Sequence, residues 1–165
     1  MESKRAELLT QILARASEAG VSIGTAESCT GGLVCSALTD VPGSSAVVRG
    51  GVVSYAVKVK EDVLGVSPSI TSDPKVGVVS AECAEAMCVG VRRVLGCDLA
   101  VSTTGIAGPG GAEPGKPVGT VWFGVSSRRG VRSKLVTFAG DRSQVREQAV
   151  CEALSLLLEE LDALR

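Results

Sequence analysis

The sequence predicts an α/β protein, a three-layer α/β/α sandwich with a mixed β-sheet, and three observations support this prediction. The chain has 165 residues, an ordinary length for one domain with a core of its own. Helical and strand-like patterns alternate over the first two thirds, which is typical of a sheet covered by helices. Two strand patterns then flank Arg129 and Gly130, which indicates an antiparallel hairpin beside the parallel strands. We find no internal repeat and no linker, so we expect residues 1–165 to form one domain.

The helices are predicted from apolar spacing and from residues that favour helix ends. Apolar side chains follow helical spacing before Gly20, a residue that suits a helix terminus. Ser80 is a good N-cap residue, and Asp141 with Gln144 three positions later resembles a capping box. We expect helices at residues 2–19, 58–64, 81–95 and 142–164, and a further helical stretch that ends near Thr39.

The strands are predicted where valine-rich or alternating segments lie between turn residues. A glycine pair, Gly50 and Gly51, lies inside one of them and indicates a bulge or a close backbone approach. Two prolines make residues 67–75 a predicted loop, and residues 105–115 form a glycine-rich loop. We expect strands at residues 21–25, 46–55, 98–104, 118–126 and 131–139.

The composition excludes several classes of function. Hydrophobic residues make up 45% and charged residues 21% of the chain, which is typical of a globular protein. The formal net charge is −1, so no general field attracts nucleic acid or an anionic membrane. Aromatic residues make up 2%, too few for a platform that stacks nucleic-acid bases. We therefore expect neither nucleic acid nor a membrane as a partner.

The chain contains no histidine, which excludes a Ser-His-Asp triad, a Cys-His pair and any His-ligated zinc site. Its six cysteines include no CxxC pair, and we expect no metal and no cofactor. The amino terminus has the pattern of an amphipathic helix rather than a signal peptide. No apolar run approaches the ~18–20 residues of a membrane span. We therefore expect a cytoplasmic protein with reduced thiols.

Two short motifs have weak structural support. Residues 110–116 match GxxxxGK of the phosphate-binding P-loop, but Pro117 stands where Ser or Thr holds magnesium, and a strand follows instead of a helix. A glycine-rich loop that lines a small-molecule site is the better interpretation. Residues 72–75 match the SxxK string of penicillin-recognising enzymes, but nearby prolines disfavour the helix that this string needs.

Two other segments carry candidate chemistry. Residues 26–32 follow a strand and begin a helix, so their free N–H groups favour an anion; simple capping by Ser28 or Thr30 is an equal alternative. Without histidine, a serine nucleophile needs another base, and a desolvated lysine can serve. Lys60 downstream of Ser45 gives one such combination, although the sequence alone does not bring the two together.

Six segments in order resemble the carboxy-terminal domain of the competence/damage-inducible CinA family. They are residues 25–32 (TAESCTGG), 43–60 (GSSAVVRGGVVSYAVKVK), 64–66 (LGV), 79–82 (VSAE), 104–111 (TGIAGPGG) and 116–123 (KPVGTVWF). The resemblance covers nearly the whole chain, and we expect no molybdopterin-binding-like domain of the kind found in full-length CinA. Stand-alone members are nicotinamide-nucleotide amidohydrolases. The resemblance therefore implies metal-independent hydrolysis of nicotinamide mononucleotide to nicotinate mononucleotide and ammonia, on an α/β/α sandwich.

The resemblance also implies roles for single residues. Ser45 falls on the nucleophile and Lys60 on its activating base, with Tyr55 as a further catalytic residue; whether Lys60 or Tyr55 is the general base stays open. If Ser45 is not the nucleophile, Ser28 is the next candidate. Arg142 falls on an arginine associated with the substrate phosphate. The substrate-binding set implied by the family motifs is Ser28, Gly31, Gly32, Thr104, Gly105 and Arg142.

Two other classes of function stay open at this point. One is a non-catalytic domain that binds a protein partner, and the other is a nucleotide sensor that uses Gly31, Gly32 and the loop at residues 105–115 without chemistry. The combination of Ser45, Tyr55 and Lys60 favours the enzyme. The family resemblance implies a homo-oligomer, and we favour a dimer.

Overall fold

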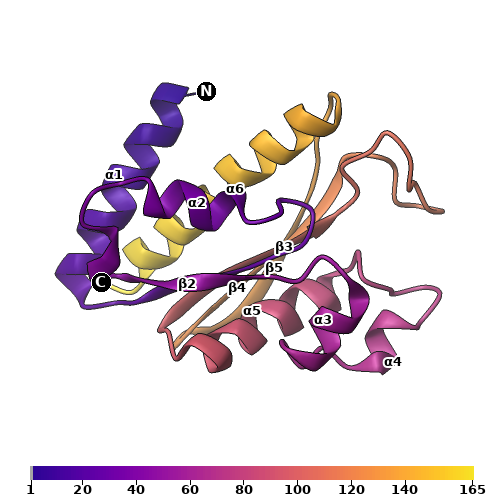
Figure 1. The fold of residues 1–165 in the computed structure, drawn as a ribbon, viewed down its shortest axis with the longest axis horizontal. Coiled ribbons are helices and arrows are strands. Elements are labelled where there is room, and N and C mark those ends of the chain that lie inside the picture. Colours follow the sequence, from indigo (N-terminus) through magenta and orange to yellow (C-terminus); the bar gives the residue numbers. More distant parts are fainter. Residues whose placement is uncertain (1) are drawn as a thin grey trace.

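The computed structural model describes residues 2–165 and confirms the three-layer arrangement (Figure 1). The five-stranded sheet has the order β2-β1-β3-β4-β5. Strands β2, β1 and β3 are parallel, and β4 and β5 are antiparallel to their neighbours, so the sheet is mixed as predicted. The strands are β1 (Ile23–Glu27), β2 (Val48–Val53), β3 (Leu99–Gly105), β4 (Thr120–Ser127) and β5 (Gly130–Thr137).

Helices cover both faces of this sheet. On one face, α1 and α6 pack against each other and α2 joins them, while α5 packs on the other face beside α3 and α4 (Figure 1). Every residue of β1, an interior strand between β2 and β3, is buried, because helices lie over both of its sides. The helices are α1 (Glu2–Ala19), α2 (Leu33–Thr39), α3 (Val57–Asp62), α4 (Pro68–Thr71), α5 (Ala81–Leu95) and α6 (Arg142–Ala163), with a short 3₁₀ turn at Ser44–Ala46.

The predicted helix ends are confirmed where side chains cap them. Ser80 Oγ accepts a hydrogen bond from the N–H of Cys83 at the start of α5, and Asp141 with Gln144 forms the capping box of α6. Gly124 of β4 lies so close to α5 that an added Cβ would collide with the carbonyl of Ala84. Only glycine lets the helix and the sheet approach this closely.

The prediction of a loop over residues 67–75 is wrong at its start, where α4 forms one short turn of helix. Pro68 occupies the first turn, and the Ser67 hydroxyl accepts from the N–H of Ser69 as an N-cap. Proline is tolerated there because the first N–H of a helix has no partner to lose. None of the helices within residues 2–165 is both long and apolar enough to cross a membrane.

The connections of the first three strands place several loops at one end of the sheet. The chain leaves β1 through α2 on one face to reach β2, then passes α5 on the other face and enters β3 on the opposite side of β1. A reversal of this kind opens a crevice beyond the carboxyl ends of the strands. Residues that follow β1, β2 and β3 therefore meet there.

Candidate active site

A buried lysine meets a serine at this end of the sheet. Lys60 lies in α3, just past β2, and its side chain is 1% exposed. Its Nζ lies 2.9 Å from Ser28 Oγ, 2.6 Å from the carbonyl oxygen of Ser54 and 3.3 Å from that of Tyr55. Among the ion pairs of residues 2–165, none involves Lys60. The lysine is therefore held by neutral oxygen atoms alone.

This environment favours the neutral amine. Burial lowers the pKa of Lys60 from its ordinary value of 10.5, because the charged form loses hydration without gaining a carboxylate partner. The thiols of Cys29 and Cys83 oppose this shift only when they are ionised. Burial raises the pKa of each thiol to about 11, so both are neutral near pH 7 and leave the lowering in place.

A buried carboxylate organises the turn after β1. Glu27 is 1% exposed, and its two carboxylate oxygens accept five hydrogen bonds. Three of the donors are N–H groups at the start of α2, where an anion is favoured. The predicted anion at this helix start is thus a side chain of the protein itself. The five donors are the hydroxyls of Thr25 and Thr30 and the N–H groups of Gly32, Val34 and Cys35.

Gly31 and Gly32 shape this turn rather than offer donors to a ligand, which corrects their predicted role in substrate binding. Both adopt left-handed backbone conformations, with φ of 60° and 98°. The N–H of Gly31 donates to the carbonyl of Ser28, and that of Gly32 donates to Glu27. Capping of α2 by Ser28 or Thr30 is also not found, because the Thr30 hydroxyl points to Glu27 and Thr103.

The predicted pairing of Ser45 with Lys60 is wrong within the chain. Ser45 is exposed in the 3₁₀ turn that precedes β2, whereas Lys60 follows the other end of that strand. The six residues of β2 separate these ends by roughly 20 Å at ~3.3 Å per residue. Lys60 reaches Ser28 instead, because β1 and β2 are parallel neighbours whose carboxyl ends coincide.

The Ser28 hydroxyl opens into a pocket of about 200 Å³. Arg142 at the start of α6 forms part of the wall: its guanidinium donates to the Tyr55 hydroxyl at 3.2 Å and to the carbonyl of Gly108 at 2.8 Å. The pocket thus brings together four residues of the predicted site, without Ser45 or Thr104. Its lining residues are Ser28, Cys29, Tyr55, Gly105, Ala107 and Arg142.

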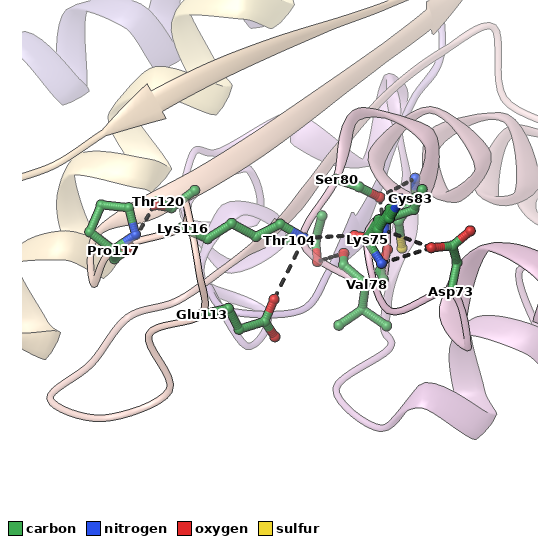
Figure 2. Close-up of polar contacts among 12 residues, drawn as sticks. Asp73, Lys75, Val78, Ser80, Cys83, Thr104, Glu113, Lys116, Pro117 and Thr120 are labelled. Atoms are coloured by element: carbon green, nitrogen blue, oxygen red, sulfur yellow. Dashed lines mark hydrogen bonds and ion pairs between the residues drawn. The ribbon is translucent and has the colours of Figure 1, made fainter.

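Thr104 supports the site from outside the pocket, which corrects its predicted contact with substrate. Its hydroxyl donates to the carbonyl of Val78 at 2.7 Å and is buried there (Figure 2). Lys116 of the glycine-rich loop donates to the carbonyl of Val76 at 2.7 Å and lies 3.6 Å from Glu113. These contacts tie residues 76–78 to the glycine-rich loop, and they engage the lysine that a P-loop would direct at a phosphate.

Sequence reasoning missed two residues at this site. Glu27 was part of a quoted motif but received no role, and Arg146 of α6 was not considered. Arg146 donates from Nε to the carbonyl of Cys29 at 3.1 Å and from Nη2 to that of Thr30 at 3.2 Å. The signal that could have identified Glu27 was a charged residue at the end of a buried strand.

No group of three or more potential metal ligands occurs within residues 2–165.

The fold and the site define an α/β sandwich with a serine–lysine pair at the carboxyl ends of two parallel strands. The CinA C-terminal domain family matches residues 5–161, and the chain belongs to this family. It is 46% identical over 140 residues to a CinA-like protein of Geobacter sulfurreducens, covering 85% of this chain and 33% of that protein. For a CinA-like protein of Mycolicibacterium gilvum the identity is 49% over 140 residues, covering 84% and 33%. The chain thus spans about a third of these curated relatives.

Solved structures of the superfamily share the whole fold. A CinA superfamily protein from Klebsiella pneumoniae 700603 superposes with a TM-score of 0.91 at 34% identity, covering 96% of this chain and 98% of that one. The competence/damage inducible protein CihA from Agrobacterium tumefaciens gives 0.90 at 38% identity, covering 96% of each chain. These likenesses establish the family and the fold, while the reaction is inferred from the site.

Proposed function

We propose that the protein is a nicotinamide-nucleotide amidohydrolase that converts nicotinamide mononucleotide to nicotinate mononucleotide and ammonia. The observation that carries this proposal is the 2.9 Å contact between Lys60 Nζ and Ser28 Oγ beside the pocket. A serine hydroxyl becomes a nucleophile when a neighbouring base accepts its proton. The family resemblance supplies the substrate class, and Ser28 replaces Ser45 as the proposed nucleophile.

The contacts of Lys60 suit the role of base. A neutral amine has two N–H donors and one lone pair. The carbonyls of Ser54 and Tyr55 accept the two hydrogens, which leaves the lone pair for the hydroxyl of Ser28. The side chain of Tyr55 points elsewhere, with its hydroxyl on Arg142, so we assign the base to Lys60 and give Tyr55 a place in the pocket wall.

The reaction follows from these positions. Ser28 Oγ bonds to the carboxamide carbon while its proton moves to Lys60 Nζ. The C–N bond then breaks, the same proton passes to the leaving nitrogen, and ammonia departs from an ester of nicotinate mononucleotide on Ser28. Water attacks this ester, gives one proton to Lys60 and releases the acid, and the proton returns to Ser28 Oγ. The two half-reactions use the same pair of residues in turn.

Two backbone N–H groups are available for the oxyanion. The N–H groups of Cys29 and Ala107 have no hydrogen-bond partner within residues 2–165, and both residues line the pocket beside Ser28. The N–H of the residue after a nucleophile is a common oxyanion donor. We assign the oxyanion to these two groups, and the substrate phosphate to Arg142 at the start of α6, where guanidinium and helix dipole both favour an anion.

The pocket also bears on how a nucleotide would bind. Its volume of about 200 Å³ is below the ~300–1,000 Å³ of most small-molecule sites. We infer that the nicotinamide ring enters the pocket and that ribose and phosphate extend over its rim. Tyr55 is 63% exposed at this rim, and its ring is free to contact the substrate.

Two further expectations stay predictions. One is assembly as a homo-oligomer, with a dimer favoured, and the other is a cytoplasmic location.

The decisive experiment compares two serine variants in an assay of ammonia release from nicotinamide mononucleotide. Ser28→Ala should abolish turnover, whereas the matched control Ser45→Ala should stay close to wild type because its hydroxyl lies at the other end of β2. Both variants should keep the fold by circular dichroism. Full activity of folded Ser28→Ala would overturn the nucleophile. A wild-type protein that binds the nucleotide without releasing ammonia would instead favour a nucleotide-sensing domain.

A further inference from the structure

Arg146 and Arg142 lie one turn apart on α6, and their guanidinium groups hold the two loops that flank the pocket. Arg142 donates to the carbonyl of Gly108 in the loop after β3. Arg146 donates to the carbonyls of Cys29 and Thr30, in the turn that carries Ser28. Arg146 takes part in none of the ion pairs of residues 2–165, so these backbone carbonyls are its polar partners.

The contacts of Arg146 fix how the peptide groups of this turn are oriented. The N–H of Gly31 donates to the carbonyl of Ser28 at 3.1 Å, so residues 28–31 form a β-turn. The central peptide joins Cys29 and Thr30, and in a trans peptide the carbonyl and the N–H point in opposite directions. With the Cys29 carbonyl on Arg146, the Thr30 N–H faces away from α6. The Ser28 carbonyl faces Gly31, and so the Cys29 N–H points out of the turn.

The orientation of these groups matters because oxyanion stabilisation depends on donors that are already in place. A donor that must reorient during the reaction loses most of its effect, and removal of one oxyanion donor costs ~10²–10³ in kcat. Glu27 holds the far side of the turn through Gly32 and Thr30. Among residues 2–165, only Arg146 donates to the carbonyl of Cys29, the residue that follows the proposed nucleophile.

We propose that Arg146 is a positioning residue: it binds the carbonyls of Cys29 and Thr30 and thereby holds the turn in which the Gly31–Ser28 hydrogen bond aims the Cys29 N–H at the oxyanion formed at Ser28. This inference rests on the proposed function for its catalytic consequence. Its structural part, the hold on the turn, stands on the two hydrogen bonds alone. Arg146 touches neither Ser28 nor Lys60 in this arrangement, and its effect passes through the backbone.

The test uses Arg146→Met, which keeps an apolar stem and removes the guanidinium, and Arg146→Lys, which keeps the charge but loses the planar guanidinium with its several N–H donors. Arg128→Met is the matched control, because Arg128 also donates to a carbonyl, that of Leu164 at 2.8 Å, at the other end of the sheet. For Arg146→Met we expect kcat to fall ~10²–10³-fold with KM within about threefold. Arg146→Lys should fall between this variant and wild type, and Arg128→Met should match wild type.

Two further measurements separate positioning from general loss of structure. Methylguanidinium added to Arg146→Ala should restore part of kcat in a saturable way, because the ion can occupy the vacated site. Amide hydrogen exchange at Gly31, whose N–H closes the turn on the carbonyl of Ser28, should become at least tenfold faster in Arg146→Met, while exchange in β3 stays unchanged. It is followed by NMR without substrate. The melting temperature of each variant is measured alongside.

The outcomes distinguish the two proposals. A kcat within threefold of wild type in Arg146→Met, or unchanged exchange at Gly31, would overturn the positioning role. An equal loss in Arg128→Met would overturn it as well, because the effect would then belong to the whole fold. If wild type releases no ammonia from nicotinamide mononucleotide, the proposed function fails, and the exchange measurement alone decides whether Arg146 holds the turn.

Discussion

Replacement of Glu27 by glutamine tests how the site is held in place. Within residues 2–165 five groups donate hydrogen bonds to this carboxylate, and the side chain is 1% exposed. Glutamine has the same shape but presents one NH₂ group where the carboxylate has an acceptor. Some donor of the protein must therefore face another donor in Glu27→Gln.

The size of the effect follows from which oxygen is replaced. If the NH₂ group takes the place of Oε2, it faces the N–H groups of Gly32 and Val34, which are donors too. If it takes the place of Oε1, it faces only the N–H of Cys35, because the Thr25 hydroxyl can turn and accept a hydrogen bond. The second arrangement leaves one buried N–H without a partner, which costs about 1–3 kcal/mol. Loss of the negative charge at the start of α2 adds about 0.3–1 kcal/mol. We expect Glu27→Gln to lower the free energy of unfolding by roughly 1.3–4 kcal/mol.

The assay is urea unfolding at pH 7, with the slope of the transition checked to be unchanged. Glu147→Gln on the exposed side of α6 is the matched control, and we expect it within about 0.5 kcal/mol of wild type. A Glu27→Gln variant destabilised by less than about 1 kcal/mol would refute the reasoning, because five donors could then be satisfied without the carboxylate.

Two further predictions concern the charges that face the pocket. Burial lowers the pKa of Lys60 in the folded protein below its ordinary value of 10.5. Burying the protonated lysine therefore costs stability, in full at any pH below the folded-state pKa. The cost fades as the pH rises from the folded-state pKa toward 10.5, because the lysine then loses its proton in the unfolded chain as well. The stability of Lys60→Met relative to wild type should therefore decrease between pH 7 and pH 11 in paired denaturation curves, and an increase would contradict the lowered pKa. Arg142→Ala should raise KM for nicotinamide mononucleotide strongly and change kcat little. The effect on nicotinamide riboside, which lacks the phosphate, should be much smaller. Equal losses on both substrates would exclude Arg142 as the phosphate ligand.

Much of the fold was predictable because its signals are local. Alternation, apolar spacing and caps are properties of neighbouring residues, and they located the hairpin around Arg129 and both ends of α5. The strand at Ile23–Glu27 was placed two residues early, because Val21 and Ser22 continue the alternating pattern although pairing begins at Ile23. Helix α4 is not predicted for a different reason: proline usually interrupts a helix, whereas Pro68 lies in the first turn, where proline favours a helix start.

The site was predicted only in part, because its decisive contact is not local. Ser28 and Lys60 are 32 residues apart, and they meet only when β1 and β2 pair in parallel with their carboxyl ends together. The sequence offers Ser45 and Ser28 as equal hydroxyls, and residue types alone do not distinguish them. The order of strands does: a serine directly after β1 and a lysine shortly after β2 share one edge, whereas a serine before β2 lies at the opposite edge.

The arrangement of the two buried charges explains how a lysine can act as base in a chain without histidine. Glu27 precedes Ser28, but successive side chains of a strand point to opposite faces, so its carboxylate turns toward the start of α2. There backbone N–H groups and hydroxyls donate hydrogen bonds to the carboxylate and stabilise its charge. Glu27 is not among the groups that shift the pKa of Lys60. A carboxylate in contact with Lys60 would stabilise the ammonium and raise its pKa. The chain directs the acid to the helix and leaves the lysine on carbonyl oxygens. Desolvation is therefore the main influence on the pKa of the amine, and its lone pair becomes available to Ser28 at lower pH.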